Sequence, residues 1–124
     1  MFKITVQDHF SATMHLPKVK GPCQKPHTHQ YRVRLCLERQ QLNEQGLVVD
    51  FYALKALLRE IIAELDQKNL NALAMFHSTP PSAEHLCFWI FEELRDKILA
   101  LDATLCSVEI HEDDTSAASY HHEG

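Results

Sequence analysis

From His27 to Leu37 the chain alternates between two kinds of side chain, and this alternation constrains the fold more than any other feature. Histidine, tyrosine and aliphatic residues share one parity (His27, His29, Tyr31, Val33, Leu35, Leu37), and polar residues hold most of the other (Thr28, Gln30, Arg32, Arg34). A period of two is that of a β-strand with one buried face. The segment therefore predicts a strand whose core face begins with two histidines.

Three other segments alternate in the same way. The first begins at Phe2 and predicts a strand to about His15, which a proline-rich loop over residues 17–26 connects to the histidine strand. Near the C-terminus, residues 106–111 predict a third strand and residues 117–120 a short fourth one. Because the first two strands are joined by a single loop, we expect them to form an antiparallel pair.

Two segments with helical spacing lie between these strand pairs. One begins at Phe51, with Asp50 as its N-cap, and the other follows Pro80-Pro81, with Ser82 as its N-cap. The order ββααββ predicts an α+β fold in which a four-stranded antiparallel sheet carries two helices on one face. At 124 residues the chain is expected to form one domain over residues 1–124. A sheet this small has unpaired edges, which favour pairing between subunits.

Composition narrows the possible partners. A formal net charge of −5 argues against nucleic acid, because phosphate binding requires a basic surface. No apolar run approaches the roughly 20 residues that span a bilayer, so no membrane partner is expected. The N-terminal segment lacks the features of a signal peptide, and the four cysteines have no Cys-x-x-Cys spacing. We therefore expect a cytoplasmic protein with reduced thiols, of which Cys36, Cys87 and Cys106 are buried in apolar segments.

The histidines are the main candidates for chemistry. His27 and His29 point to one face of a strand, and with His15 from the preceding strand they can hold a zinc ion that keeps one position open. Hydrogen bonds from the two histidines to the backbone are the simpler alternative. A second alternative is a structural zinc site in which Cys23 is a ligand and no coordination position stays open. If the zinc site is catalytic, the metal ion and Lys25 favour the thiolate form of Cys23. This thiolate can then abstract a proton from a carbon atom of the substrate.

Three carboxylates are further candidates. Glu112 follows the third strand in register with its apolar residues, where it can reach water or accept hydrogen bonds from the N–H groups of a heterocycle. Asp66 lies at the end of the first helix, where the helix dipole disfavours a negative charge. Glu84 begins the second helix, where the dipole favours it, and we interpret it as mainly structural.

Several of these residues occur together in the order of a known family. The chain has His15, the element Cys23-x-x-x-His27-x-His29, Leu65-Asp66, and Glu112 followed by Tyr120. Together with Leu70-Asn71 and Pro81-Ser82-Ala83-Glu84, this set resembles the 6-pyruvoyl-tetrahydropterin and 6-carboxy-tetrahydropterin synthases. The resemblance covers about residues 10–120, and the short length and compact loops look more like the bacterial carboxy-type enzyme of queuosine biosynthesis.

The resemblance implies a tunnelling fold and a homohexamer built as a dimer of trimers. It implies Zn²⁺ held by His15, His27 and His29, with Cys23 and Asp66 as catalytic residues. Glu112 would anchor the pterin, with Ser82 and Glu84 beside it. The implied reaction converts 7,8-dihydroneopterin triphosphate to 6-carboxy-5,6,7,8-tetrahydropterin.

The chain departs from the family pattern at three positions. Gln67 stands where the family has its relay histidine, and an amide cannot accept and return a proton. Thr28 stands between the paired histidines in place of glycine. The segment from Phe10 to His15 is one residue longer than the Phe-x-Ala-x-His spacing, and a bulge would return His15 to the metal side. Because Gln67 replaces the relay histidine, two alternatives to the implied reaction stay open. One is altered chemistry on a pterin side chain, and the other is a non-catalytic protein that binds zinc and pterin.

Overall fold

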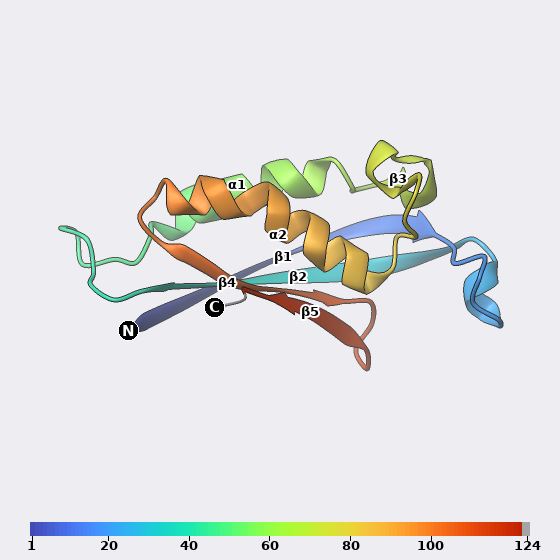
Figure 1. Cartoon of the computed structure of the whole chain (residues 1–124), viewed down its shortest axis with the longest axis horizontal. Helices are drawn as coiled ribbons and strands as arrows, with labels where there is room; N and C mark the ends of the chain where they lie inside the picture. Colours follow the sequence, from blue (N-terminus) through green and yellow to red (C-terminus); the bar gives the residue numbers. More distant parts are fainter. Residues whose placement is uncertain (123–124) are drawn as a thin grey trace.

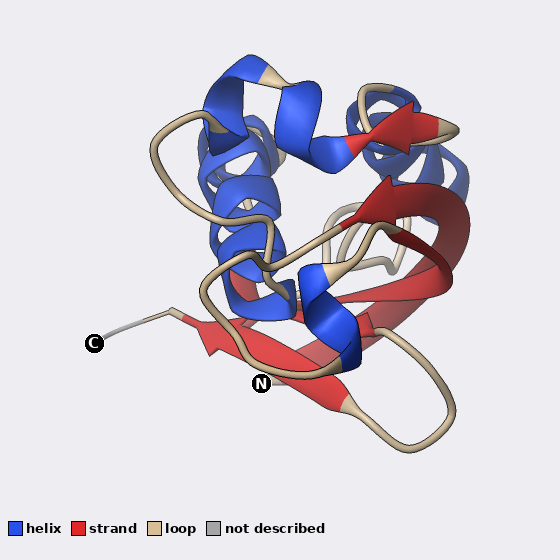
Figure 2. Cartoon of the chain, turned by 90° about the vertical axis from the view of Figure 1, so that its right-hand side faces the viewer, coloured by secondary structure: helices blue, strands red, loops and turns tan. Residues whose placement is uncertain are grey.

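The structure is a computed structural model that describes residues 1–122, so Glu123 and Gly124, the end of the predicted domain, lie outside it. The strands are β1 (Phe2–Met14), β2 (His27–Arg39), β3 (Lys68–Asn69), β4 (Thr104–His111) and β5 (Ala117–His121), and the helices are α1 (Phe51–Ala63) and α2 (Ala83–Leu99). Short 3-10 turns cover Pro22–Gln24, Leu70–Ala72 and Ala74–Phe76. Both long helices lie on the same side of the sheet (Figures 1 and 2). The α+β fold is confirmed.

The sheet has one strand more than the sequence predicts. Its order is β3-β1-β2-β4-β5, in which β1, β2, β4 and β5 are antiparallel neighbours. The additional strand β3 pairs parallel to the end of β1, through Ala12 and Thr13. A two-residue strand has no recognisable alternation, which is why the sequence did not predict it. The four-stranded antiparallel sheet is otherwise as expected.

β1 and β2 pair without interruption, and the bulge expected before His15 is absent. The register runs one residue at a time from Phe2 opposite Arg39 to Met14 opposite His27. The even-numbered residues of β1 from Val6 onward are therefore directed to the core, and Met14 is almost completely buried. His15 comes after the last pair, so the prediction of a bulge that moves it to the metal side is wrong.

The helices begin where the sequence predicts. The Asp50 carboxylate accepts a hydrogen bond from the N–H of Tyr52, and Ser82 Oγ accepts one from the N–H of His85. These caps satisfy N–H groups that have no partner within the helix. The buried face of α1 packs on β1 and that of α2 on β4 and β5, and the core side chains are nearly all apolar. No helix within residues 1–122 is long and apolar enough to cross a membrane.

β2 and β4 pair with a bulge, and two of the three cysteines expected to be buried are only partly so. The register shifts between Cys36 and Leu37, so Leu105 faces the core in place of Cys106. Cys106 is consequently half-buried. Cys36 is half-buried as well, because it lies on the even face of β2, away from the core, whereas Cys87 on α2 is fully buried as expected. Burial raises the pKa of both Cys87 and Cys106 to about 12, so these two thiols stay protonated near neutral pH.

Candidate functional site

His27 and His29 form a close pair at the start of β2. Their ring centroids are 4.6 Å apart and the rings meet edge to face. Nδ1 of His27 lies 2.8 Å from the carbonyl oxygen of Lys25. A carbonyl only accepts, so Nδ1 carries a proton, and in the neutral ring Nε2 then has the free lone pair of a metal-ligating imidazole.

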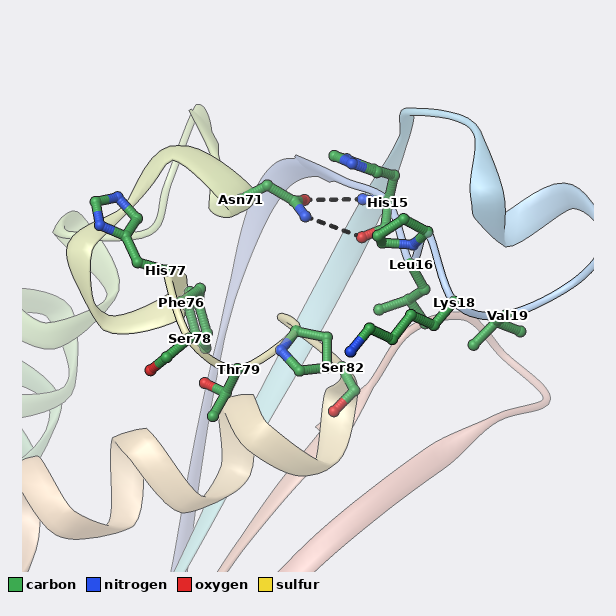
Figure 3. Close-up of a pocket in the computed structure, with 12 residues that line it drawn as sticks. His15, Leu16, Lys18, Val19, Asn71, Phe76, His77, Ser78, Thr79 and Ser82 are labelled. Carbon is green, nitrogen blue, oxygen red and sulfur yellow. Dashed lines mark hydrogen bonds between the residues drawn. The ribbon is translucent and has the colours of Figure 1, made fainter.

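His15 lies just past the end of β1, where a single side chain fixes its backbone. The His15 N–H donates to Oδ1 of Asn71 at 2.9 Å, and Nδ2 of Asn71 donates to the His15 carbonyl at 3.0 Å (Figure 3). Asn71 reaches this place because the 3-10 turn Leu70–Ala72 follows β3, which pairs with the end of β1. Sequence reasoning treated Asn71 only as part of a motif and did not find this contact.

The structure does not bring the three predicted zinc ligands together. Across residues 1–122, no group of three histidine, cysteine, aspartate or glutamate side chains is arranged to hold a metal ion. Two imidazoles of the expected set are adjacent and one has a suitable tautomer, but His15 is not part of the cluster. The residues present therefore do not fit the three-imidazole zinc site that the resemblance implies.

Cys23 lies in the loop between β1 and β2. It belongs to the 3-10 turn Pro22–Gln24 and is half-buried, and its carbonyl accepts a hydrogen bond from the N–H of Leu16 at 2.6 Å. This bond ties the turn to the residue after His15. The loop thus returns Cys23 to the end of the sheet at which the histidine pair lies.

Asp66 connects the end of α1 to β1. Its carboxylate accepts a hydrogen bond from the N–H of Ser11 at 3.0 Å, and the N–H of Gln67 donates to the Ser11 carbonyl at 2.6 Å. The bond from Ser11 is the main reason that the pKa of Asp66 is lowered, with a smaller contribution from the Gln67 amide. Gln67 has a φ of 62°, a left-handed conformation that a residue other than glycine rarely adopts. Ser11 pairs with Gln30 on β2, next to His29.

Glu84, at the start of α2, and Glu112, just after β4, lie at a second cavity. They line one cavity of about 150 Å³ together with Ala83 and residues 116–118. The N–H of Glu112 donates to the carbonyl of Ser116, which fixes the turn between β4 and β5. Glu84 is exposed and Glu112 half-buried, so both carboxylates are accessible to a ligand in this cavity.

Tyr31 adds a polar atom that sequence reasoning missed. The residue is fully buried on β2 and stacks on Phe10 with centroids 4.8 Å apart, and its hydroxyl has no hydrogen-bond partner. Burial raises the pKa of Tyr31, and the nearby Glu112 charge raises it further. The sequence did offer a signal for this polar atom, because Tyr31 lies on the predicted core face of β2 among aliphatic residues. A buried donor near Glu112 without a partner is suited to a ligand.

A larger cavity of about 500 Å³ lies between the end of β1 and the segment before α2. His15, Lys18, Asn71 and Ser82 contribute to its wall, as does the turn at residues 76–80. Figure 3 shows the Lys18 side chain directed across the cavity toward Ser82. Ser82 therefore caps α2 and also lines this cavity, whereas Glu84 lines the smaller one.

Comparison with known proteins identifies the family of this chain. The family model for 6-pyruvoyl tetrahydropterin synthase matches residues 3–123. A 6-carboxy-5,6,7,8-tetrahydropterin synthase from Synechocystis is 36% identical over 116 residues, which are 90% of this chain and 86% of the relative. A dihydroneopterin monophosphate aldolase from Pyrococcus furiosus is 29% identical over 72 residues, 58% of each chain. The chain belongs to the 6-pyruvoyl tetrahydropterin synthase family.

The fold has a close match among solved structures. The 6-pyruvoyl tetrahydropterin synthase of Caenorhabditis elegans superimposes with a TM-score of 0.86 over 98% of this chain and 96% of its own. Their sequences are 23% identical, so this likeness concerns the fold. It confirms the tunnelling fold, with two helices on a mainly antiparallel sheet.

Proposed function

We propose that the protein binds a dihydropterin and acts on its side chain, and that its reaction is the conversion of 7,8-dihydroneopterin triphosphate to 6-carboxy-5,6,7,8-tetrahydropterin. The observation that carries the pterin proposal is the shared cavity of Glu84 and Glu112. The specific reaction is supported by the Synechocystis relative, whose match extends over 90% of this chain.

In this proposal Glu112 recognises the pyrimidine edge of the pterin. That edge presents a ring N–H and an amino group side by side, and a carboxylate accepts from both at once. The Tyr31 hydroxyl is buried, has no partner and lies near Glu112, so it can donate to that carboxylate when a ligand is bound. Glu84 and Ser82 lie at the start of α2, on the walls of two neighbouring cavities.

Cys23 is the proposed proton carrier. It lies on the loop between the strands, at the end of the sheet where His27 and His29 lie, and it is half-buried. We assign Asp66 a supporting role, because its carboxylate is held by the backbone of Ser11. No proton relay through residue 67 is proposed, since the Gln67 amide cannot exchange a proton near neutral pH.

A second candidate is different chemistry on the pterin side chain, with a retro-aldol cleavage as the simplest case. Two observations favour it: Gln67 in place of a base, and a third histidine that does not join the pair. The aldolase relative supports the same class of substrate with another reaction.

The assembly is also a proposal. Within residues 1–122, most of β1 and all of β5 lack a neighbour on their outer side, because β3 covers only two residues of β1. Free sheet edges of this length favour pairing between copies. We propose that the protein is a cytoplasmic homohexamer, and light scattering on the purified protein measures its mass directly.

A product assay tests the proposed reaction. Purified protein is incubated with 7,8-dihydroneopterin triphosphate and, separately, with 7,8-dihydroneopterin, and the pterin products are separated by chromatography. Formation of 6-carboxy-tetrahydropterin that disappears in Cys23→Ala supports the proposal. Cleavage of the second substrate only would identify the altered chemistry, and binding without turnover would contradict both enzymatic assignments.

A further inference from the structure

We propose that Met14, not His15, is the residue of β1 that faces the His27–His29 pair. The metal position of this chain then has two imidazoles and a thioether in place of three imidazoles, and the protein binds zinc weakly. This inference concerns metal affinity and does not depend on the reaction proposed above.

The register of the hairpin places Met14 beside the histidines. Met14 is the direct partner of His27, and Ala12 is the direct partner of His29. Directly opposed residues of an antiparallel pair have Cβ atoms about 4.5–5.5 Å apart on the same face of the sheet. A side chain at position 14 therefore emerges next to the His27 imidazole. Met14 is only 1% exposed, so it is directed inward like the histidines.

His15 cannot take that place without breaking its contacts with Asn71. The N–H and the carbonyl of His15 are both bonded to the one Asn71 side chain, at 2.9 and 3.0 Å. These bonds fix the backbone on both sides of the His15 Cα. A one-residue slip of β1 would move His15 opposite His27, but it would also turn Phe10, Ala12 and Met14 away from the core.

The chemistry of zinc explains why this substitution matters. Protein zinc sites use thiolate sulfur, imidazole nitrogen and carboxylate oxygen, and a neutral thioether is not among these ligands. His27 already has the tautomer that leaves Nε2 free. The two imidazoles therefore form half of a site, and the side chain opposite them decides whether it is completed.

The test is zinc affinity, measured by competition with a chromophoric chelator on the assembled protein after metal removal. Met14→His should raise the affinity by roughly a hundredfold, the scale of one additional ligand in a tetrahedral site. Met14→Leu is the matched control: it keeps an apolar side chain and should leave the affinity unchanged. His15→Ala should also leave it unchanged, because His15 is not a ligand.

A second variant at position 14 keeps the test informative if Met14→His does not fold, and a double variant checks that the gain depends on His27. Met14→Cys supplies a thiol that tolerates burial and can ligate zinc, so it should strengthen binding if Met14→His is unstable. Adding His27→Ala to either variant should remove the gain, since both side chains would hold one ion. Tight stoichiometric zinc in the unmodified protein, or its loss in His15→Ala, would overturn the proposal.

Discussion

The carboxylate of Asp66 accepts a hydrogen bond from the N–H of Ser11 at 3.0 Å and so joins the segment after α1 to the C-terminal part of β1. Gln67 completes the junction through the Ser11 carbonyl. The residue that the resemblance assigns to a proton relay thus also has a structural role, which stability measurements can separate from catalysis.

The first prediction concerns acid stability. Because this bond lowers the pKa of Asp66 in the folded protein, its contribution is present above the unfolded pKa near 3.8 and is lost as the pH falls through the folded value. Asp66→Asn keeps the shape and one acceptor oxygen but cannot titrate. Urea unfolding should show that this variant is less stable than the parent at pH 7 and that the difference narrows below about pH 4. A constant difference across that range would contradict the assignment.

Removing the Tyr31 hydroxyl should stabilise the ligand-free protein. A buried hydroxyl without a partner costs about 1–3 kcal/mol, and phenylalanine keeps the stacking on Phe10. We expect Tyr31→Phe to raise the free energy of unfolding by about 1 kcal/mol in chemical denaturation. The same variant should bind 7,8-dihydroneopterin more weakly if the hydroxyl serves the ligand. A less stable variant with unchanged pterin binding would contradict the proposed role.

Asn71 should matter for stability through its two bonds to His15. Asn71→Ala leaves a half-buried N–H and carbonyl without a partner, and we expect a loss of about 1–3 kcal/mol in the free energy of unfolding. Asn71→Asp is the informative control, since its carboxylate accepts from the His15 N–H but cannot donate to the carbonyl. It should be intermediate at best. Equal stability of all three proteins would show that water replaces the amide without cost.

Gln67→His tests whether the missing base limits the reaction. An imidazole at this position can accept and return a proton, and general acid–base catalysis typically contributes about 10²–10⁴-fold. We expect kcat for 7,8-dihydroneopterin triphosphate to rise in this variant while zinc affinity stays constant. Gln67→Gly is the control, because glycine accepts the φ of 62° without strain and adds no base. If kcat rose by a similar factor in both variants, the gain would come from a change in the backbone at residue 67 and not from the added base.

Much of the fold could be predicted because its signals are local. The alternation in β2 and the caps Asp50 and Ser82 each depend on a few neighbouring residues, and the structure confirms them. The strand β3 and the shifted register at Cys36 depend on how distant segments meet, and no local pattern reports that.

The candidate site was harder to predict for the same reason. The sequence between Phe10 and His15 is compatible both with a bulge and with an undistorted strand. Only the continuous pairing of β1 with β2 in the structure decides between them. The meeting of Glu84 with Glu112 was suggested by the resemblance, whereas the unpartnered Tyr31 hydroxyl becomes visible only once burial is known.

Recognition of a pterin by Glu112 is the central claim, and binding measured by calorimetry tests it most directly. Glu112→Gln keeps the size of the side chain but removes its charge and one of its two acceptors, so 7,8-dihydroneopterin should bind at least about tenfold more weakly. Glu109→Gln is the matched control, since Glu109 pairs with Arg34 and His111 outside the cavity, and it should bind like the parent. Equal binding by the parent and both variants, or no binding by the parent, would contradict the account.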